Sequence, residues 1–172
     1  QIGKKIGLNK NSVNYRVKRM IGKGVIQGFY TEIDMYKLGF TLYRIFLRLQ
    51  NITIEKEKEI IDFFVNYPNV GWVFSVEGTF DIVVGLYFKT NQEYKEFEEW
   101  LFDKFGNIIE NKLVSVFTKM YQLKRNYLIT KKAIQNPYAI IGESADIKID
   151  ELDDAILYIL STDSRTPIYE IA

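Results

Sequence analysis

The chain has 172 residues, 47% of them hydrophobic and 15% aromatic, enough for one large domain or two small ones. It contains no cysteine and no histidine, which excludes disulfides, thiolate nucleophiles, the usual zinc sites and the commonest general base. No apolar run approaches the ~18 residues of a membrane span, and no signal peptide is visible. We therefore expect a cytoplasmic protein with no metal, no other cofactor and no membrane partner.

The formal net charge of +1 conceals an uneven distribution. Residues 1–31 carry seven basic side chains and no acidic one. Residues 51–112 carry twelve acids and six bases, and residues 143–172 carry eight acids and two bases. A basic head on an acidic body indicates one module that binds a polyanion and another with a different task.

The basic head has the pattern of a helix-turn-helix. Residues 1–7 are expected to end one helix, and Asn9 is a good N-cap for a second helix with Val13, Val17 and Met20 as its buried stripe. Glycines at 22 and 24 end that helix, and residues 25–33 are predicted as a strand. A short basic helix followed by a β-ribbon is what a winged helix-turn-helix needs to enter a DNA major groove. The alternative is a solvated basic helix on an ordinary domain.

The exposed face of this second helix carries the candidate DNA contacts. Arg16 and Arg19 are three positions apart, and each could pair bidentately with guanine at ~1–3 kcal/mol of discrimination. Lysines here are expected to contact phosphate or only solvent. Asn14, next to the apolar stripe, is expected to be partly buried. The full candidate set is Lys10, Asn11, Ser12, Tyr15, Arg16, Lys18 and Arg19.

A linker at 34–41 is followed by a β-α-β-β-α-β pattern, typical of a ferredoxin-like domain. The predicted elements are a strand at 42–50, a helix at 55–67, strands at 70–78 and 80–88, a helix at 92–106 and a strand at 112–123. The predicted inward side chains are Tyr43, Ile45, Leu47 and Leu49 on the first strand, Ile60, Ile61, Phe64 and Val65 on the first helix, and Tyr94, Phe97, Leu101 and Phe105 on the second. We interpret the acids of the second helix as a solvated face.

The predicted sheet is apolar on both faces. Opposite the side chains that face the helices lie Val83, Gly85 and Tyr87, and the last strand is apolar on both sides. Because a one-sided sheet should have a wet outer face, something must cover this one. We favour a second copy of the chain, in a symmetric dimer, over the alternative that the C-terminal tail folds back.

A connector at 128–148 leads to a last helical unit at 149–172. Leu152, Ile156, Ile159 and Leu160 are spaced as one helix face. Thr166 is a predicted N-cap, and Pro167 would occupy the first position of a further helix.

With these residues in view, the chain resembles the Lrp/AsnC (feast/famine) transcription regulators. QIGKKIGLNKNSVNYRVKRMIGKGVIQGFYTEIDMYKLGF is similar to their winged helix-turn-helix and linker, and Leu42 to about Tyr127, including VEGTFDIVVG, resembles their ligand-binding RAM domain. IDELDDAILYILSTDSRTPIYEIA resembles the opening of the same DNA-binding unit. The resemblance implies an α+β chain: a winged helix-turn-helix lacking its first helix (1–33), a ferredoxin-like RAM domain for effector binding and dimerisation (42–127), and the start of a second helix-turn-helix unit.

This order departs from the family, in which one DNA-binding unit precedes one RAM domain. We expect a segment of a longer tandem protein, or a chain whose ends are not shown. The alternative is a domain swap, in which the C-terminal helix completes the N-terminal unit of another copy.

The resemblance also implies function. It predicts a sequence-specific regulator, not an enzyme, whose partners are double-stranded DNA, further copies of itself as a dimer or higher oligomer, and an amino-acid effector. The effector would contact the turn between the second and third strands, at Gly78, Thr79 and Asp81. A structural role is the alternative, since glycine permits a hairpin turn and aspartate can bond nearby amides. Two other functions stay open: a siroheme-decarboxylase-like enzyme, against which the lack of histidine counts, and a stand-alone small-molecule sensor.

Overall fold

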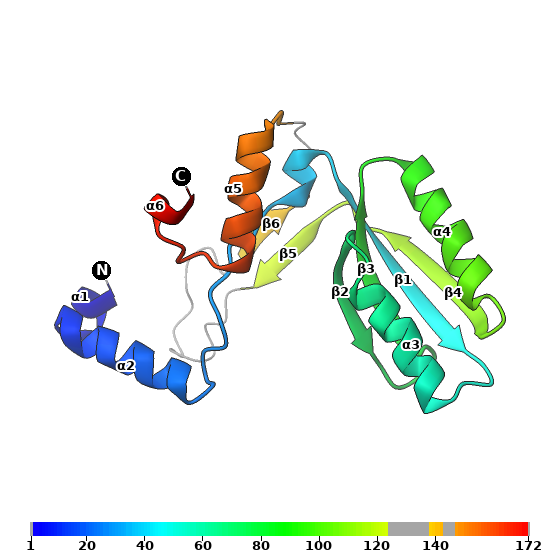
Figure 1. Cartoon of the computed structure of the whole chain (residues 1–172), viewed down its shortest axis with the longest axis horizontal. Coiled ribbons are helices and arrows are strands. Elements are labelled where there is room, and N and C mark those ends of the chain that lie inside the picture. Colours follow the sequence, from blue (N-terminus) through cyan, green and yellow to red (C-terminus); the bar gives the residue numbers. More distant parts are fainter. Residues whose placement is uncertain (1, 124–137, 143–146, 172) are drawn as a thin grey trace. The chain divides into compact units, whose positions relative to one another are not determined.

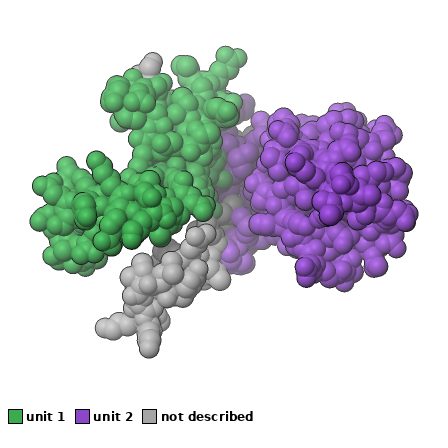
Figure 2. All heavy atoms as spheres, turned by 60° about the horizontal axis from the view of Figure 1, so that its bottom comes forward, with its two compact units in different colours: residues 1–33, 149–172 green, residues 34–148 purple. Residues whose placement is uncertain are grey.

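The computed structural model of the chain describes residues 2–123, 138–142 and 147–171 (Figure 1). Its residues group into two compact units (Figure 2). One unit consists of Gln1–Ile33 together with Ile149–Ala172, and the other of Asp34–Lys148. No helix in the described ranges is long and apolar enough to cross a membrane.

The larger unit is an antiparallel sheet with two helices on one face (Figure 1). Its elements are β1 (Thr41–Leu49), α3 (Ile54–Val65), β2 (Val70–Ser75), β3 (Ile82–Phe88), α4 (Asn91–Phe105) and β4 (Ile109–Val116). The strand order is β2-β3-β1-β4, with β1 paired to both β3 and β4. This arrangement confirms the predicted α+β, ferredoxin-like βαββαβ fold.

The core lies between the sheet and the two helices, and strand alternation builds it. Every second residue of β1 from Tyr43 to Leu49 is buried. The same alternation on β3 buries Ile82, Val84, Leu86 and Phe88. The helices add Ile60, Phe63, Phe64, Phe97, Leu101 and Phe105. Threonines fix the start of both helices: Thr53 accepts from the backbone N–H of Lys56, and Thr90 from that of Glu93.

One predicted core position on α3 is wrong. The side chain of Val65 is 63% exposed, whereas Phe63, which was not predicted, is buried. Phe63 and Phe64 follow Ile60 by three and four positions, so they share its helix face. Val65 lies a further position round the helix and leaves that face.

The predicted strand at 112–123 is two strands, which corrects the sequence-based interpretation. β4 ends at Val116, and β5 (Met120–Leu123) pairs instead with β6 (Tyr138–Ile141) in a separate two-stranded sheet. The predicted connector at 128–148 lies largely outside the described residues, but β6 shows that it contains a strand. Apolar residues run through both strands, so periodicity alone did not show the break.

The predicted linker at 34–41 contains a short helical turn. Met35–Leu38 forms a 3-10 turn, capped where Asp34 accepts from the backbone N–H of Tyr36 at 3.2 Å. Gly39 ends the turn with φ of 80°, a left-handed conformation that favours glycine. The Tyr36 side chain is 5% exposed and its hydroxyl donates to the carbonyl of Phe117.

The smaller unit contains α1 (Ile2–Ile6), α2 (Lys10–Gly22), α5 (Glu151–Thr162) and α6 (Ile168–Ile171). The predicted strand at 25–33 is wrong: this segment has no strand conformation. Its backbone pairs with the end of α5 instead, because Thr31 N–H donates to Leu160 at 3.0 Å and Ser164 N–H to Phe29 at 2.9 Å. These bonds satisfy backbone groups that a β-ribbon would have paired with a neighbouring strand.

Candidate nucleic-acid interface

The turn between α1 and α2 is tightly held. Gly7 has φ of 67°, and the Leu8 N–H donates to the Gly3 carbonyl at 2.9 Å. The Asn9 side chain accepts from the backbone N–H of Ser12 at 2.8 Å, which confirms the predicted N-cap. Two short helices in this arrangement form the predicted helix-turn-helix.

The predicted DNA contacts lie on the outer surface of α2. Lys10, Asn11, Tyr15, Arg16, Lys18 and Arg19 are exposed, and Ser12 is half-buried. Asn11, Tyr15 and Lys18 follow one another at helical spacing, so they form one row along the helix. Arg19 lies one turn from Tyr15, and the tyrosine ring is 67% exposed. This surface can therefore present a row of polar, aromatic and cationic groups to a groove.

The opposite face of α2 is less buried than expected. Val13, Val17 and Met20 are half-buried rather than buried, and Asn14, expected to be partly buried, is exposed. A hollow of about 400 Å³ bordered by Ile2, Leu8 and Val13 accounts for part of this exposure.

The charge around this helix has one sign. The seven basic side chains of residues 1–31 have no acidic neighbour in that stretch, and none of them forms an ion pair with a described residue. Unpaired surface cations on one helix and its flanks are the usual electrostatic footprint of a phosphate-binding surface.

The predicted effector turn is held at one end. Gly78 has φ of 136° and is exposed with Thr79. Asp81 is half-buried, and its carboxylate accepts from the backbone N–H of Leu49 at 2.7 Å. Its own N–H donates to the carbonyl of Leu47 at 2.9 Å. Asp81 therefore fastens the turn to β1, whereas the tip leaves Gly78 and Thr79 accessible.

The outer face of the four-stranded sheet is apolar, as predicted. Trp72 lies over Gly85, where a Cβ atom would collide with the indole ring. The Arg44 guanidinium lies between the rings of Phe46 and Phe117, at 4.8 and 4.7 Å, and its Nε is buried without a described partner. The Phe74 side chain is 58% exposed. This face carries more exposed apolar surface than a wet sheet face normally shows.

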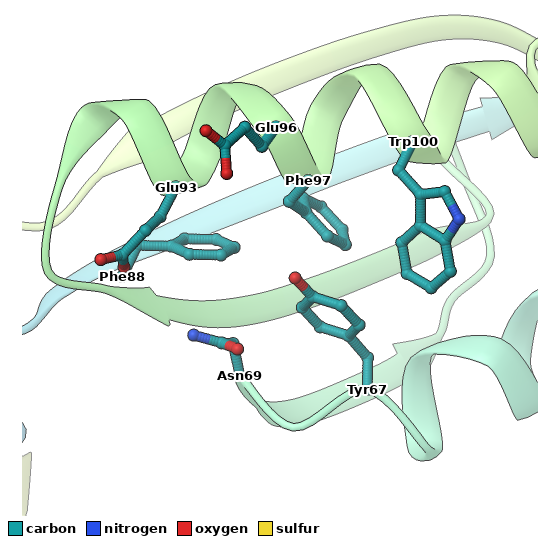
Figure 3. Close-up of a pocket in the computed structure, with 7 residues that line it drawn as sticks. All are labelled: Tyr67, Asn69, Phe88, Glu93, Glu96, Phe97 and Trp100. Carbon is teal, nitrogen blue, oxygen red and sulfur yellow. The ribbon is translucent and has the colours of Figure 1, made fainter.

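Sequence reasoning missed a cavity on the helix side of the sheet (Figure 3). Glu93 and Glu96, interpreted as part of a solvated face, border it together with aromatic rings. The rings come from three segments, with Tyr67 after α3, Phe88 at the end of β3, and Phe97 and Trp100 on α4, so no single local motif marks the cavity. No group of three or more acidic side chains in the described ranges is placed to hold a metal ion.

Comparisons with known proteins connect this geometry to a regulator class. No family model matches the chain. It is 28% identical over 97 residues to the HTH-type transcriptional regulator FL11 of Pyrococcus furiosus, covering 56% of this chain and 63% of that protein. It is 32% identical over 76 residues to the HTH-type transcriptional regulator Ptr1 of Methanocaldococcus jannaschii, covering 41% and 51%. The chain thus spans less than two thirds of the length of these relatives.

Solved structures share the fold. LrpC of B. subtilis matches with a TM-score of 0.54 at 22% identity, covering 67% of this chain and 77% of that one. An AsnC family transcriptional regulator from Agrobacterium tumefaciens matches with a TM-score of 0.59 at 20% identity, covering 78% and 83%. The transcriptional regulator NMB0573 of Neisseria meningitidis, solved as an L-Met complex, matches with a TM-score of 0.59 at 14% identity, covering 72% and 76%. The predicted resemblance is confirmed: this chain has the fold of the Lrp/AsnC regulators and is related in sequence to HTH-type transcriptional regulators.

Proposed function

We propose that this chain is a sequence-specific DNA-binding transcription regulator, not an enzyme, and that α2 enters the major groove. The observation that carries the proposal is the exposed cationic surface of α2 and its flanks, in a stretch with seven basic residues and no acid. Arg16 and Arg19 are assigned to bases, with Asn11, Ser12 and Tyr15 beside them. Lys10 and Lys18 are assigned to phosphates.

The test is DNA affinity over a salt series, comparing the parent chain with Arg16→Ala/Arg19→Ala. The parent is expected to lose affinity steeply as salt rises, because binding to phosphates releases counterions. The double variant should bind more weakly, by ~1–3 kcal/mol for each lost base contact, and should discriminate less between DNA sequences, because its arginines are assigned to bases. Lys56→Ala/Lys58→Ala is the matched control, since it removes two exposed cations from α3 in the other unit. Equal losses in both double variants, or no binding at low salt, would overturn the proposal.

We further propose that the chain acts as a homodimer or higher oligomer through the outer sheet face that carries Trp72, Phe74 and Arg44. An exposed apolar sheet face is self-complementary under a twofold axis, and a dimer would present two copies of α2 to paired half-sites. The exposed Phe74 supports this assignment.

An amino-acid effector at the turn of Gly78, Thr79 and Asp81 is the third part of the proposal. The fold neighbour from Neisseria is an L-Met complex, which supports amino acids as the first compounds to test. Thr79→Ala is the informative variant, because Thr79 is exposed at the tip whereas Asp81 holds the turn. It should weaken the effect of the amino acid on DNA affinity and leave affinity without effector unchanged.

A further inference from the structure

The cavity on the helix side of the sheet has a volume of about 350 Å³ (Figure 3). It lies between α4 and the chain that joins α3 to β2, at the opposite end of β2 and β3 from the effector turn at 76–81. Ligand pockets in proteins span roughly 300–1,000 Å³, so this one is large enough for a small ligand only.

Aromatic rings form its walls. The ring of Tyr67 lies 4.8 Å from that of Phe97 and 5.5 Å from that of Trp100, and Phe88 lies 5.6 Å from Phe97. Phe88 and Phe97 are buried, whereas Trp100 is 47% exposed at the edge. Because packing already fixes these rings, a ligand that contacts their faces does not have to order the side chains on binding.

Two carboxylates stand on one side of the cavity. Glu93 and Glu96 lie three positions apart on α4 and so share one face of that helix. One oxygen of Glu93 accepts from the backbone N–H of Lys89 at 3.0 Å, and one of Glu96 from the side-chain amide of Gln92 at 2.9 Å. The second oxygen of each carboxylate has no hydrogen bond to a described residue, and neither carboxylate is in an ion pair with one.

The negative charges of these carboxylates affect the pKa of the Tyr67 hydroxyl. Burial raises the pKa of Tyr67, and the negative charges of Glu93 and then Glu96 raise it further. A cavity whose own groups disfavour a further negative charge favours a positive one.

The same aromatic cluster already holds a cation on its other side. The Lys104 ammonium lies 5.1 Å from the ring centroid of Phe63, and the Phe63 ring lies 4.5 Å from that of Trp100. No lysine or arginine lines the cavity beside Glu93 and Glu96. The chain therefore supplies a cation at Phe63, whereas a cation beside Glu93 and Glu96 would have to come from outside the described residues.

We propose that this cavity binds a small organic cation carrying an alkylammonium or alkylguanidinium group. The charged head pairs with the free oxygens of Glu93 and Glu96, and the rings of Tyr67 and Trp100 receive it by cation–π contact. Asn69 is fixed beside the entrance, because its amide donates to the carbonyl of Tyr87 at 2.7 Å. The site does not depend on DNA binding by the other unit.

The test is a titration of the full chain with n-butylammonium and n-butylguanidinium, with n-butanol as the neutral probe, followed by the indole N–H signals in nuclear magnetic resonance spectra. The chain has two tryptophans, and Trp72 lies on β2 over Gly85, outside the cavity lining. Trp72→Phe assigns the two signals. The expected result is a saturable shift of the Trp100 signal with both cations, little shift of the Trp72 signal, and no saturable response to n-butanol.

Glu96→Gln is the decisive variant and Glu99→Gln its matched control. Both remove one negative charge from α4, but Glu99 pairs with Lys95 on the surface and does not line the cavity. Glu96→Gln should weaken cation binding about tenfold while Glu99→Gln changes it by less than about twofold. Equal effects of the two variants, an equal response to n-butanol, or no saturable shift in the parent would overturn the proposal.

Discussion

The carboxylate of Asp81 accepts a hydrogen bond from the backbone N–H of Leu49 at 2.7 Å, although the two residues are 32 positions apart. Leu49 is the last residue of β1, and Asp81 stands just before β3. The bond therefore satisfies a donor at the end of one strand and fixes the approach to the next. Asp81, which the family resemblance assigns to an effector site, therefore also has a structural role.

We expect Asp81→Ala to lower the free energy of unfolding of the larger unit by about 1–3 kcal/mol, because the Leu49 N–H would lose a charged acceptor. Urea unfolding followed by tryptophan fluorescence measures this unit, since Trp72 and Trp100 both lie in it. Asp103→Ala is the control, because Asp103 is exposed on α4. If both variants unfold at the same urea concentration, the bond contributes nothing to stability.

Strand alternation made most of the larger unit predictable. On β1, inward side chains alternate with outward ones at Tyr43, Ile45, Leu47 and Leu49. A period of two over that length indicates a strand with one buried face. The helices predicted at 55–67 and 92–106 also lie within two residues of α3 and α4 as observed. Val65 was misassigned because helical spacing gives a face only approximately, and packing against the rings of Trp100 and Phe105 on α4 selected Phe63 instead.

Long-range pairing was not predictable in the same way. The segment 25–33 has strand-forming residues, yet its backbone bonds to the end of α5, more than a hundred positions away. The cavity of Tyr67, Phe88 and Trp100 is likewise assembled by tertiary packing, and each of its residues has an ordinary local context. By contrast, the α2 surface was predictable, because Asn9, Arg16 and Arg19 belong to one continuous motif.

Glu98 gives the larger unit a dependence on pH. Burial acts to raise the pKa of Glu98, but hydrogen bonds from Lys112 and Tyr94 and the positive charge of Lys112 outweigh it, so the pKa lies below its ordinary value of 4.5. The unfolded chain then binds a proton at higher pH than the folded chain does. The stabilising contribution is present above the unfolded-state pKa and is lost as the pH falls through the folded-state pKa.

We expect Glu98→Gln to flatten the loss of stability below about pH 4.5, measured as the urea midpoint across a pH series with tryptophan fluorescence. Glu99→Gln should keep the parent's profile, because its pair with Lys95 is on the surface. The same acid slope in the parent and both variants would show that Glu98 does not determine it.

The outer sheet face predicts a specific effect on assembly. Phe74→Glu places a charge on β2 where a second copy would pack. It should weaken the dimer by about 2 kcal/mol, which raises the dissociation constant roughly thirtyfold. Sedimentation equilibrium over a concentration series measures this. Val65→Glu is the control, because Val65 is 63% exposed on α3 and Phe74 is 58% exposed, so both changes replace similar surface. An unchanged dissociation constant for Phe74→Glu would place the interface elsewhere.

Residues from opposite ends of the chain meet where the Arg165 guanidinium lies 3.4 Å from the ring centroid of Phe29. The contact sits beside the two backbone bonds that join Thr31 to Leu160 and Ser164 to Phe29. A cation–π contact of ~0.5–2 kcal/mol would help to keep those bonds closed.

Phe29→Ala should therefore speed amide hydrogen exchange at Thr31 and Ser164 by roughly two- to thirtyfold, the range that corresponds to losing such a contact. Exchange is measured residue by residue by nuclear magnetic resonance. Tyr30→Ala is the matched control, because the neighbouring Tyr30 ring is 71% exposed and its loss should leave both amides protected. Rapid exchange at Thr31 and Ser164 in the parent chain would mean that α5 does not stay on this segment in solution. If exchange is slow in the parent chain and becomes fast only in Phe29→Ala, the acidic helix α5 packs in solution within the unit that carries the basic α2 surface.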